Sequence, residues 1–426
     1  MRALEQRISR TRLAPRLTVV SERVPGVRSV SLGFWVDRGA RDETRASMGL
    51  SHLYEHMIFK GTRRRSPRDI AGALEKSGGS LNAFTGKEQV CLHARFVDDE
   101  LANACDVIRD IFCESRFDSE ELAKEKQVVI EEIRGSEDNP EDAVQEALMG
   151  CLYPGHPLGF PIAGQRKNLN AYNRASLLAA QRAMQGARLV VTASGSVDHR
   201  ALCREFCALA ALSGSGAKRP GARRAPAPSR GCRRVLTRDI LQANVALGFR
   251  ACPYASPDKF ALIVLNTLLG DGMCSRLFQS VREELGLVYT IFSFAEAFAD
   301  TGILGVYFGT EPAKCLPALT RVLAEIRALT EKGVTPAELD FAKSYIRGGL
   351  LLGMENTGNR MGQLARSELY LGKTETVLTA LRQLERITGE DLKHVARKYL
   401  TPANLSVAVV GPRQKGLHKA LQRIAF

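Results

Sequence analysis

The triplet Leu32-Gly33-Phe34, set in an alternating hydrophobic stretch, returns 215 residues later as Leu247-Gly248-Phe249. Two further pairs of segments repeat at offsets of 216 and 217 residues: VVTASG (190–195) with LSVAVVG (405–411), and FDSEEL (117–122) with VTPAEL (334–339). Self-similarity at a nearly constant offset is the signature of an internal duplication. The chain of 426 residues is therefore expected to fold as two related domains.

Each copy mixes alternating strands with helical stretches, which is typical of an α+β domain whose helices cover a largely antiparallel sheet. The two matching helix starts both carry a capping signature, Asp118 with Glu121 and Thr335 with Glu338. The same helix is thus specified twice. We predict homologous domains over residues 1–212 and 231–426, the first with a metal site and the second without one.

A basic linker is expected between the copies, over residues 213–230. Its sequence, SGSGAKRPGARRAPAPSR, is rich in Gly, Pro and Ser, which favours a flexible and solvated segment. It contains five cations and no acid: Lys218, Arg219, Arg223, Arg224 and Arg230. Part of the net charge of +14 has this local source. The alternative, a nucleic-acid-binding protein with a structural zinc, lacks support because no RNA-binding or helix-turn-helix pattern stands out.

The bulk composition is that of a soluble globular protein, with 45% hydrophobic and 25% charged residues. No run approaches the ~18 consecutive apolar residues of a membrane span. An arginine-rich start resembles a mitochondrial transit peptide, but strand-like residues from Leu17 onward favour a folded domain there, and we expect a cytoplasmic protein. The ten cysteines show no CxxC spacing and are expected to be reduced, mostly buried thiols.

The segment GLSHLYEHMIFKGT (49–62) carries the chemistry. On a helix, His52 and His56 are one turn apart, so that both imidazoles can reach one metal ion. Glu55 lies on the same side and is free to take a proton from a bound water. The alternative is a helix with solvated polar residues, but the apolar neighbours indicate burial, and buried His and Glu side chains need partners.

A catalytic zinc ion takes three protein ligands and leaves one position for water. Two candidates for the third ligand, Glu125 and Glu132, lie seven residues apart on one face of the helix that begins near Ser119. The neighbouring Glu131 points elsewhere on that helix and is expected to be solvated. In the second copy the corresponding positions are Ala342 and Gly349, and the stretch aligned with the histidines, 268–272, contains no histidine. The first copy alone is expected to hold the metal.

The segments HLYEHMIFKGT, GGSLNAFT and EKQVVIEEI resemble the pitrilysin/insulinase family of zinc metallopeptidases, and most closely its bacterial members that are similar to mitochondrial processing peptidase. The resemblance covers nearly the whole chain. It implies one zinc ion per chain held by His52, His56 and Glu132. It further implies that Glu55 is the general base and that Glu125 is a second acid supporting the site.

The resemblance also suggests how peptides bind. The residues after Gly79 look like the edge strand, including Asn82 and Ala83, to which a substrate peptide adds as an extra strand. Arg282 and Tyr289 match a pair that reaches the substrate from the opposite side.

In the family that this sequence resembles, two such two-domain bodies face each other like a clamshell around a closed chamber. A chain of this length supplies only one of these bodies, so the resemblance implies a partner. We expect a homodimer, with a heterodimer of homologous subunits as the alternative. The resulting hypothesis is a zinc endopeptidase acting on peptides or unfolded segments. Its main rival is a non-catalytic, peptide-binding subunit of a processing peptidase.

Overall fold

The structure is a computed structural model that describes residues 6–213 and 223–424. Its contacts divide the chain into two compact units. The first unit consists of Met1–Arg134, Phe160–Arg224 and Leu351–Leu378, and the second of Gly135–Gly159, Ala225–Leu350 and Thr379–Phe426. The boundaries 212 and 231 predicted for the duplicated sequence stay a prediction. In packing terms, each sequence half contributes one segment to the unit built mainly by the other half.

The first unit is built on a sheet with the strand order β1-β2-β6-β3-β5-β4. All neighbours are antiparallel except β2 and β6, which are parallel. Its strands are β1 (Arg7–Ala14), β2 (Leu17–Arg23), β3 (Ser29–Val36), β4 (Ser80–Thr85), β5 (Val90–Val97) and β6 (Leu189–Gly195).

The second unit has a sheet with the order β7-β11-β8-β10-β9. Here β7 and β11 are parallel and all other neighbours antiparallel. Its strands are β7 (Cys232–Thr237), β8 (Ala243–Ala251), β9 (Thr290–Ala297), β10 (Gly302–Thr310) and β11 (Ser406–Gly411).

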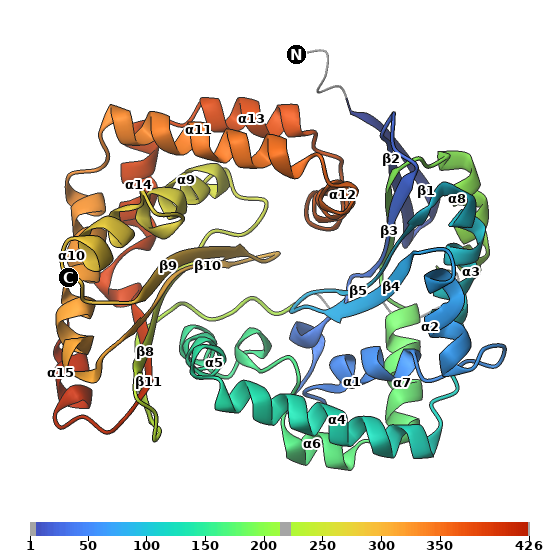
Figure 1. Cartoon of the computed structure of the whole chain (residues 1–426), viewed down its shortest axis with the longest axis horizontal. Coiled ribbons are helices and arrows are strands. Elements are labelled where there is room, and N and C mark those ends of the chain that lie inside the picture. The colour runs from blue at the N-terminus through green and yellow to red at the C-terminus, as the bar shows by residue number, and fades with distance from the viewer. Residues whose placement is uncertain (1–5, 214–222, 425–426) are drawn as a thin grey trace. The chain divides into compact units, whose positions relative to one another are not determined.

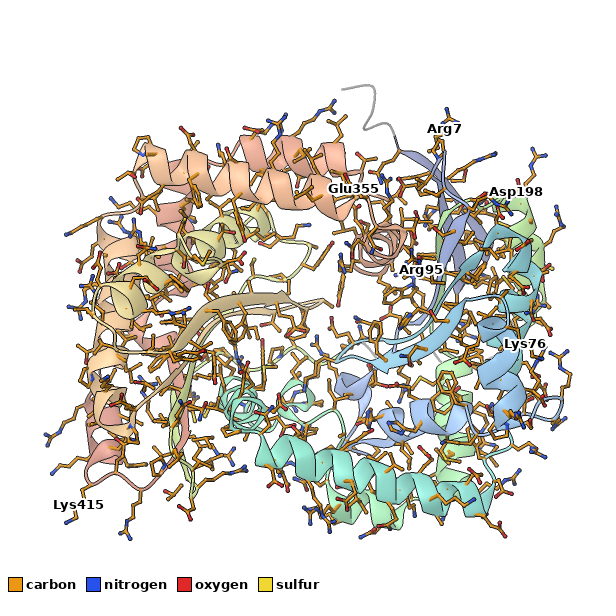
Figure 2. All side chains as sticks on the ribbon, in the orientation of Figure 1. Arg7, Lys76, Arg95, Asp198, Glu355 and Lys415 are labelled. Atoms are coloured by element: carbon orange, nitrogen blue, oxygen red, sulfur yellow. The ribbon has the colours of Figure 1, made fainter. Side chains whose placement is uncertain are left out.

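Charged side chains such as Lys76 and Lys415 lie on the surface (Figure 2). In chain order, the α-helices of both units are α1 (Leu50–Ile58), α2 (Pro67–Glu75), α3 (Leu101–Cys113), α4 (Ser119–Asp138), α5 (Pro140–Leu152), α6 (Arg166–Ala171), α7 (Arg174–Gln185), α8 (His199–Phe206), α9 (Lys259–Gly270), α10 (Cys315–Glu331), α11 (Pro336–Gly353), α12 (Thr357–Leu371), α13 (Val377–Glu385), α14 (Gly389–Tyr399) and α15 (Leu417–Arg423). Short 3-10 helices cover Ala40–Asp42, Asp98–Glu100, Pro157–Gly159, Cys207–Ser213, Pro312–Lys314 and Pro402–Asn404, and a π-helical turn covers Phe278–Glu283.

The two sheets confirm the duplication. The strands β2-β6-β3-β5-β4 correspond in order to β7-β11-β8-β10-β9. In both sheets the first pair of neighbours is parallel and the next three pairs are antiparallel. Strand β1 is an additional edge strand of the first sheet. The repeated triplets occupy equivalent central strands, because Gly33 lies in β3 and Gly248 in β8. The prediction of two α+β halves with largely antiparallel sheets is confirmed.

One face of each sheet is covered by a helix from the other half of the sequence. In the first unit, α12 packs on β6, β3 and β2, on the face opposite α3 and α8 (Figure 1). In the second unit, α5 packs on β11 and β8. The equivalent glycines make room for these helices: a Cβ on Gly33 would come within 2.3 Å of the Met361 sulfur, and one on Gly248 within 3.2 Å of Leu148 Cδ2.

The two predicted helix starts are capped as expected. Asp118 Oδ1 accepts the backbone N–H groups of Glu120 and Glu121, at 2.8 and 3.2 Å, at the start of α4. At the start of α11, Thr335 Oγ1 accepts the Glu338 N–H at 3.3 Å, and a Glu338 carboxylate oxygen accepts the Thr335 N–H at 2.7 Å. Both arrangements satisfy backbone donors that a helix leaves free in its first turn.

One residue departs from the solvated linker that the composition predicts, whereas Arg224 and Arg230 are exposed as expected. Lys218 and Arg219 lie outside the described residues, but Arg223 is held against the first unit. Its guanidinium contacts Asp37 at 3.0 Å and Asp42 at 3.1 Å, and it donates to the Glu88 carbonyl at 2.7 Å. Its side chain is 20% exposed. A solvated arginine was the wrong expectation here because two carboxylates from a different part of the sequence converge on it.

Candidate metal centre

Helix α1 carries the histidine motif and begins at a position that needs glycine. Gly49 has φ 85°, and a Cβ there would lie 2.5 Å from the Ala163 carbonyl oxygen. The buried Glu43 carboxylate accepts the N–H groups of Gly49 and Ser51, at 2.8 and 2.6 Å. Leu53 and Met57 are fully buried in the core of the unit. The first turn of α1 is thus fixed, and the polar side chains on its other face are positioned with it.

The two imidazoles of α1 lie side by side. Their ring centroids are 4.7 Å apart, as the spacing of one helical turn predicts. Both side chains are largely buried, with 18% of His52 and 16% of His56 exposed. Burial, reinforced by the neighbouring His56, lowers the pKa of His52 to about 4. His52 is therefore neutral at physiological pH, which is the form that can donate a lone pair to a metal.

Helix α4 brings two carboxylates to this pair, and they take different places. Glu132 Oε2 lies 3.8 Å from His52 Nε2 and 3.4 Å from His56 Nε2. Glu125 Oε2 instead contacts the opposite nitrogen of His56, Nδ1, at 3.0 Å. Glu131 is 63% exposed and pairs with Arg134 on its own helix. Of the two candidates for a third ligand, only Glu132 lies between both histidines.

The three groups fit a metal ion of the size of zinc. The atoms that His52, His56 and Glu132 offer all lie within 4.8 Å of one another, and no other group of three such residues was found in the described ranges. Ligands of a tetrahedral zinc ion at about 2.1 Å stand roughly 3.4 Å apart. The distances from Glu132 Oε2 to the two Nε2 atoms, 3.8 and 3.4 Å, are close to this value. Each imidazole presents its Nε2 atom toward Glu132, so that the two Nε2 atoms and the Glu132 carboxylate face a common point.

Glu55, the predicted base, is held at the same site by a strand residue. Thr85 Oγ1, at the end of β4, donates to Glu55 Oε2 at 2.6 Å. Burial raises the pKa of the Glu55 carboxyl, and the hydrogen bond from Thr85 acts in the opposite direction. The carboxylate is thus fixed in direction, and its affinity for a proton is increased by burial.

Two residues at the site were not assigned a role from the sequence. Lys60 Nζ contacts Glu125 Oε1 at 2.5 Å, so a chain of contacts runs from Lys60 through Glu125 to His56. Lys60 stands four residues after His56, and residues at this spacing lie on the same face of a helix, so the sequence could have suggested that the two are close. Thr85 had no such signal, because its contact with Glu55 depends on how β4 packs against α1.

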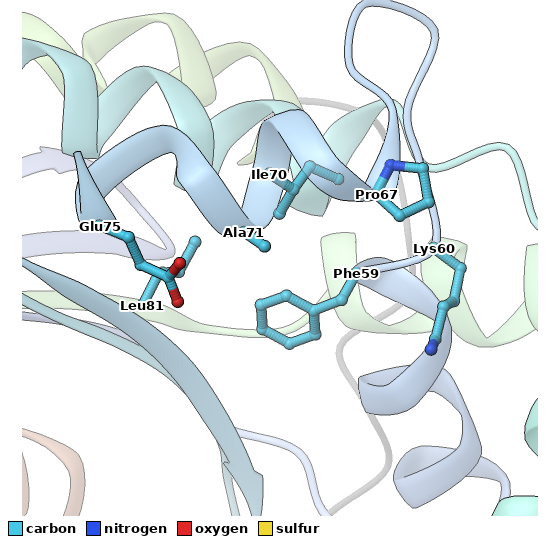
Figure 3. A pocket seen from close by; sticks show the side chains of 7 residues that line it. All are labelled: Phe59, Lys60, Pro67, Ile70, Ala71, Glu75 and Leu81. Atoms are coloured by element: carbon cyan, nitrogen blue, oxygen red, sulfur yellow. The ribbon is translucent and has the colours of Figure 1, made fainter.

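A small cavity lies beside the site, between the end of α1, helix α2 and strand β4. Its volume is about 280 Å³. Figure 3 shows the Phe59 ring facing Ile70 and Ala71, with the Lys60 and Glu75 side chains on either side. Pro67 and Leu81 complete the lining. The walls are apolar except for these two charges of opposite sign.

The predicted edge strand is observed. Strand β4 pairs with β5 and is the last strand of its sheet, so among the described residues no strand pairs with its other side. Asn82 is exposed and its Oδ1 accepts the Ala83 N–H at 2.8 Å, while Ala83 is buried in the core. The free edge begins next to Thr85, which contacts Glu55.

Arg282 and Tyr289 lie together in the second unit. The Arg282 guanidinium is 5.8 Å from the centre of the Tyr289 ring and 4.5 Å from that of Phe278. Tyr289 is 77% exposed. An aromatic ring so exposed beside a cation is available to a ligand, and the role of the pair stays a prediction.

Comparison with known proteins bears on this site. The sequence profile "Insulinase (Peptidase family M16)" matches residues 18–166, and the profile "Peptidase M16 inactive domain" matches residues 173–346. A protein of Mycobacterium tuberculosis named "uncharacterized zinc protease" is 39% identical over 420 residues, covering 95% of this chain and 93% of the relative. This chain belongs to peptidase family M16. The family prediction is thus confirmed.

Further similar proteins extend the comparison. A Bacillus subtilis protein, also named "uncharacterized zinc protease", is 36% identical over 398 residues, covering 92% of this chain and 96% of the relative. The crystal structure of a protease from Helicobacter pylori matches with a TM-score of 0.88 at 20% identity, covering 96% of this chain and all of that one. A structure from Pseudomonas fluorescens, titled as an M16 inactive domain, gives 0.88 at 21% identity. These structures support the fold.

Proposed function

We propose that this M16 protein is a zinc-dependent endopeptidase in which His52, His56 and Glu132 hold the metal. The observation that carries the proposal is the convergence of two neighbouring, largely buried imidazoles and one carboxylate within 4.8 Å. The printed names of its relatives, zinc proteases, agree with it. Bound zinc supplies a Lewis acid that polarises a peptide carbonyl and lowers the pKa of a coordinated water.

The roles of the chain's own residues follow from their contacts. Glu55 accepts a proton from the attacking water and passes it to the leaving amine, while Thr85 keeps one of its oxygens in place. Glu125 accepts a hydrogen bond from His56 Nδ1–H, which would leave the Nε2 lone pair free for the metal. Lys60 neutralises Glu125 on its other oxygen. No residue in this set forms a covalent bond with the peptide.

Peptide binding is proposed at the free edge of β4. An extended peptide adds there through backbone hydrogen bonds beside Asn82 and Ala83, which gives affinity with little sequence preference. The apolar cavity lined by Phe59 and Ile70 supports acceptance of an apolar side chain of that peptide. Arg282 and Tyr289 are proposed as further substrate contacts, and a homodimer as the assembly.

The structure contains no helix, within the residues it describes, that has both the length and the apolar character to cross a bilayer. We place the enzyme in the cytoplasm as part of the same proposal.

The test combines metal analysis with digestion of a mixed peptide pool, using wild type, Glu55→Gln and Glu131→Gln. Glu131 is a matched control because it is an exposed neighbour on the metal-binding helix. We expect about one zinc per chain in all three proteins. Cleavage should fall by roughly 10²- to 10⁴-fold in Glu55→Gln alone, the usual contribution of a general base.

Two outcomes would contradict the proposal. Undiminished cleavage by Glu55→Gln would remove Glu55 from the mechanism. Zinc binding without cleavage by the wild type, at any protein concentration and with all peptides, would favour the non-catalytic peptide-binding subunit instead.

A further inference from the structure

Two cysteines of the second unit, Cys151 and Cys232, have their sulfur atoms almost in bonding contact. Cys151 Sγ and Cys232 Sγ are 2.6 Å apart, and both residues belong to the second unit. A disulfide bond measures about 2.05 Å, so a shift of roughly half an ångström would join them. Both are thiols in the structure.

Cys151 is fixed by the packing of α5. It stands one residue before the end of that helix, whose neighbouring turns are buried against β8 and β11. The helix end is held by Arg250, which donates from Nε to the Leu152 carbonyl at 2.6 Å and lies 4.6 Å above the Tyr153 ring. The Cys151 sulfur therefore has little freedom to move away from its neighbour.

Cys232 is fixed just as firmly from the other side. It is the first residue of β7, where it pairs with Ser406 of β11. The preceding Gly231 has φ 62°, and a Cβ there would come within 2.8 Å of the Leu405 carbonyl oxygen. Because two separate sets of contacts hold the sulfurs together, ring closure between them requires almost no loss of conformational freedom.

The two thiols differ in access. Cys151 is 5% exposed, whereas Cys232 is only partly buried. Burial, together with the adjacent Cys232, raises the pKa of the Cys151 thiol, and Arg234 and Arg233 act in the opposite direction. A reagent from solution therefore meets Cys232 first. Burial favours the protonated form of Cys151 in the reduced protein, and Arg234 and Arg233 offset this effect only in part.

We propose that Cys151 and Cys232 are a redox modification site that closes to a disulfide on exposure to a soluble low-molecular-weight disulfide. The Cys232 thiolate attacks one sulfur of that reagent, forming a mixed disulfide and releasing one thiolate. The Cys151 thiolate then attacks Cys232 and releases the second. The reagent is reduced to two thiols, which carry the two protons that the protein has lost.

The bond would tie α5 to β7 covalently. Helix α5 follows directly on α4, the helix that carries Glu125 and Glu132, and β7 follows directly on the linker. The closed loop would span residues 151–232 and so include the linker. Closing a loop of this length restricts the unfolded chain strongly, so the oxidised protein should be the more stable form.

The test is a disulfide map of the full-length protein after incubation with oxidised glutathione. Trypsin cuts after Arg134 and Arg166 and after Arg230 and Arg233, so that each cysteine lies alone in its peptide. We expect a linked pair of peptides, 135–166 with 231–233, which dithiothreitol separates. The melting temperature should rise by about 5 °C or more on oxidation and return on reduction.

Three variants make the test decisive. Cys232→Ser and Cys151→Ala should each abolish both the linked peptides and the oxidation-dependent shift, whereas Cys274→Ser, at an exposed cysteine, should preserve them. Measuring every variant in dithiothreitol as well removes the effect of altered packing. The proposal is overturned if the linked pair does not form and glutathione is found only on Cys207 or Cys274. A linked pair without a change in melting temperature would contradict only the expected stabilisation.

Discussion

Helices α4 and α11 are the same element in two copies, but only α4 brings carboxylates to the histidine pair of α1. Both begin with a side-chain cap, Asp118 in the first and Thr335 in the second. Where α4 places Glu125 against His56, the sequence repeat places Ala342 in α11, fully buried in an apolar core. The caps and the apolar face are what the fold requires of this helix. The carboxylates of α4 are an addition that the fold itself does not need.

The largest effect is expected from making the first copy resemble the second. Glu132→Gly reproduces the residue found at Gly349 and removes the carboxylate that lies within 3.8 Å of both histidines. Zinc affinity should fall by more than the ~10- to 100-fold that the loss of a supporting residue costs. The measurement is a competition titration with a chelator, paired with elemental analysis.

The reverse substitution, Gly349→Glu, is the matched control for that comparison. It places a carboxylate on α11, but the aligned stretch 268–272 holds no histidine. Zinc content should stay at one per chain. A second zinc in this variant, or wild-type affinity in Glu132→Gly, would show that the two copies differ for another reason.

A smaller effect is expected for Glu125→Ala, which copies Ala342. The imidazole of His56 would lose its partner at Nδ1 and its ring would turn more freely. We expect zinc affinity to drop by about 10- to 100-fold, with zinc still bound at saturating concentration. Chelator competition again measures it, and Glu131→Ala should leave the affinity unchanged.

Lys60 allows a finer test of the same chain of contacts. Lys60→Met keeps the length of the side chain but removes the ammonium that contacts Glu125. Zinc affinity should fall by about 10-fold or less, since Lys60 touches no ligand of the metal directly. Lys60→Arg should recover most of the loss. Equal losses in both variants would indicate disturbed packing near Phe59 rather than a lost charge.

The sheets offer a comparison that concerns stability alone. Gly33→Ala inserts a methyl group into the space filled by Met361 of α12 and by the side chain of Trp35 on the same strand, and should cost about 1–3 kcal/mol. Gly248→Ala meets Leu148 at a longer distance and should cost less, below about 1 kcal/mol. Urea unfolding of both variants gives the values. A larger cost at Gly248 would mean that α5 yields less readily than α12.

Much of this could be predicted from the sequence because it rests on local patterns. The duplication, the two capped helix starts and the histidines one turn apart all depend on residues close together in the chain. Other features could not be predicted. Helix α5 packs on the sheet of the second unit and α12 on that of the first, although each helix belongs to the other half of the sequence. Arg223 likewise contacts the distant Asp42. No local sequence pattern relates these segments.

The sequence by itself determined that two imidazoles share one side of a short helix, since helical geometry fixes residues four apart. It also limited the third ligand to two acids on one face of α4. Only the tertiary structure decided between them, because the crossing of α1 and α4 sets Glu132 beside the Nε2 atoms and Glu125 beside Nδ1 of His56. In the same way, only packing could bring Thr85 to Glu55 and the Cys151 sulfur to that of Cys232.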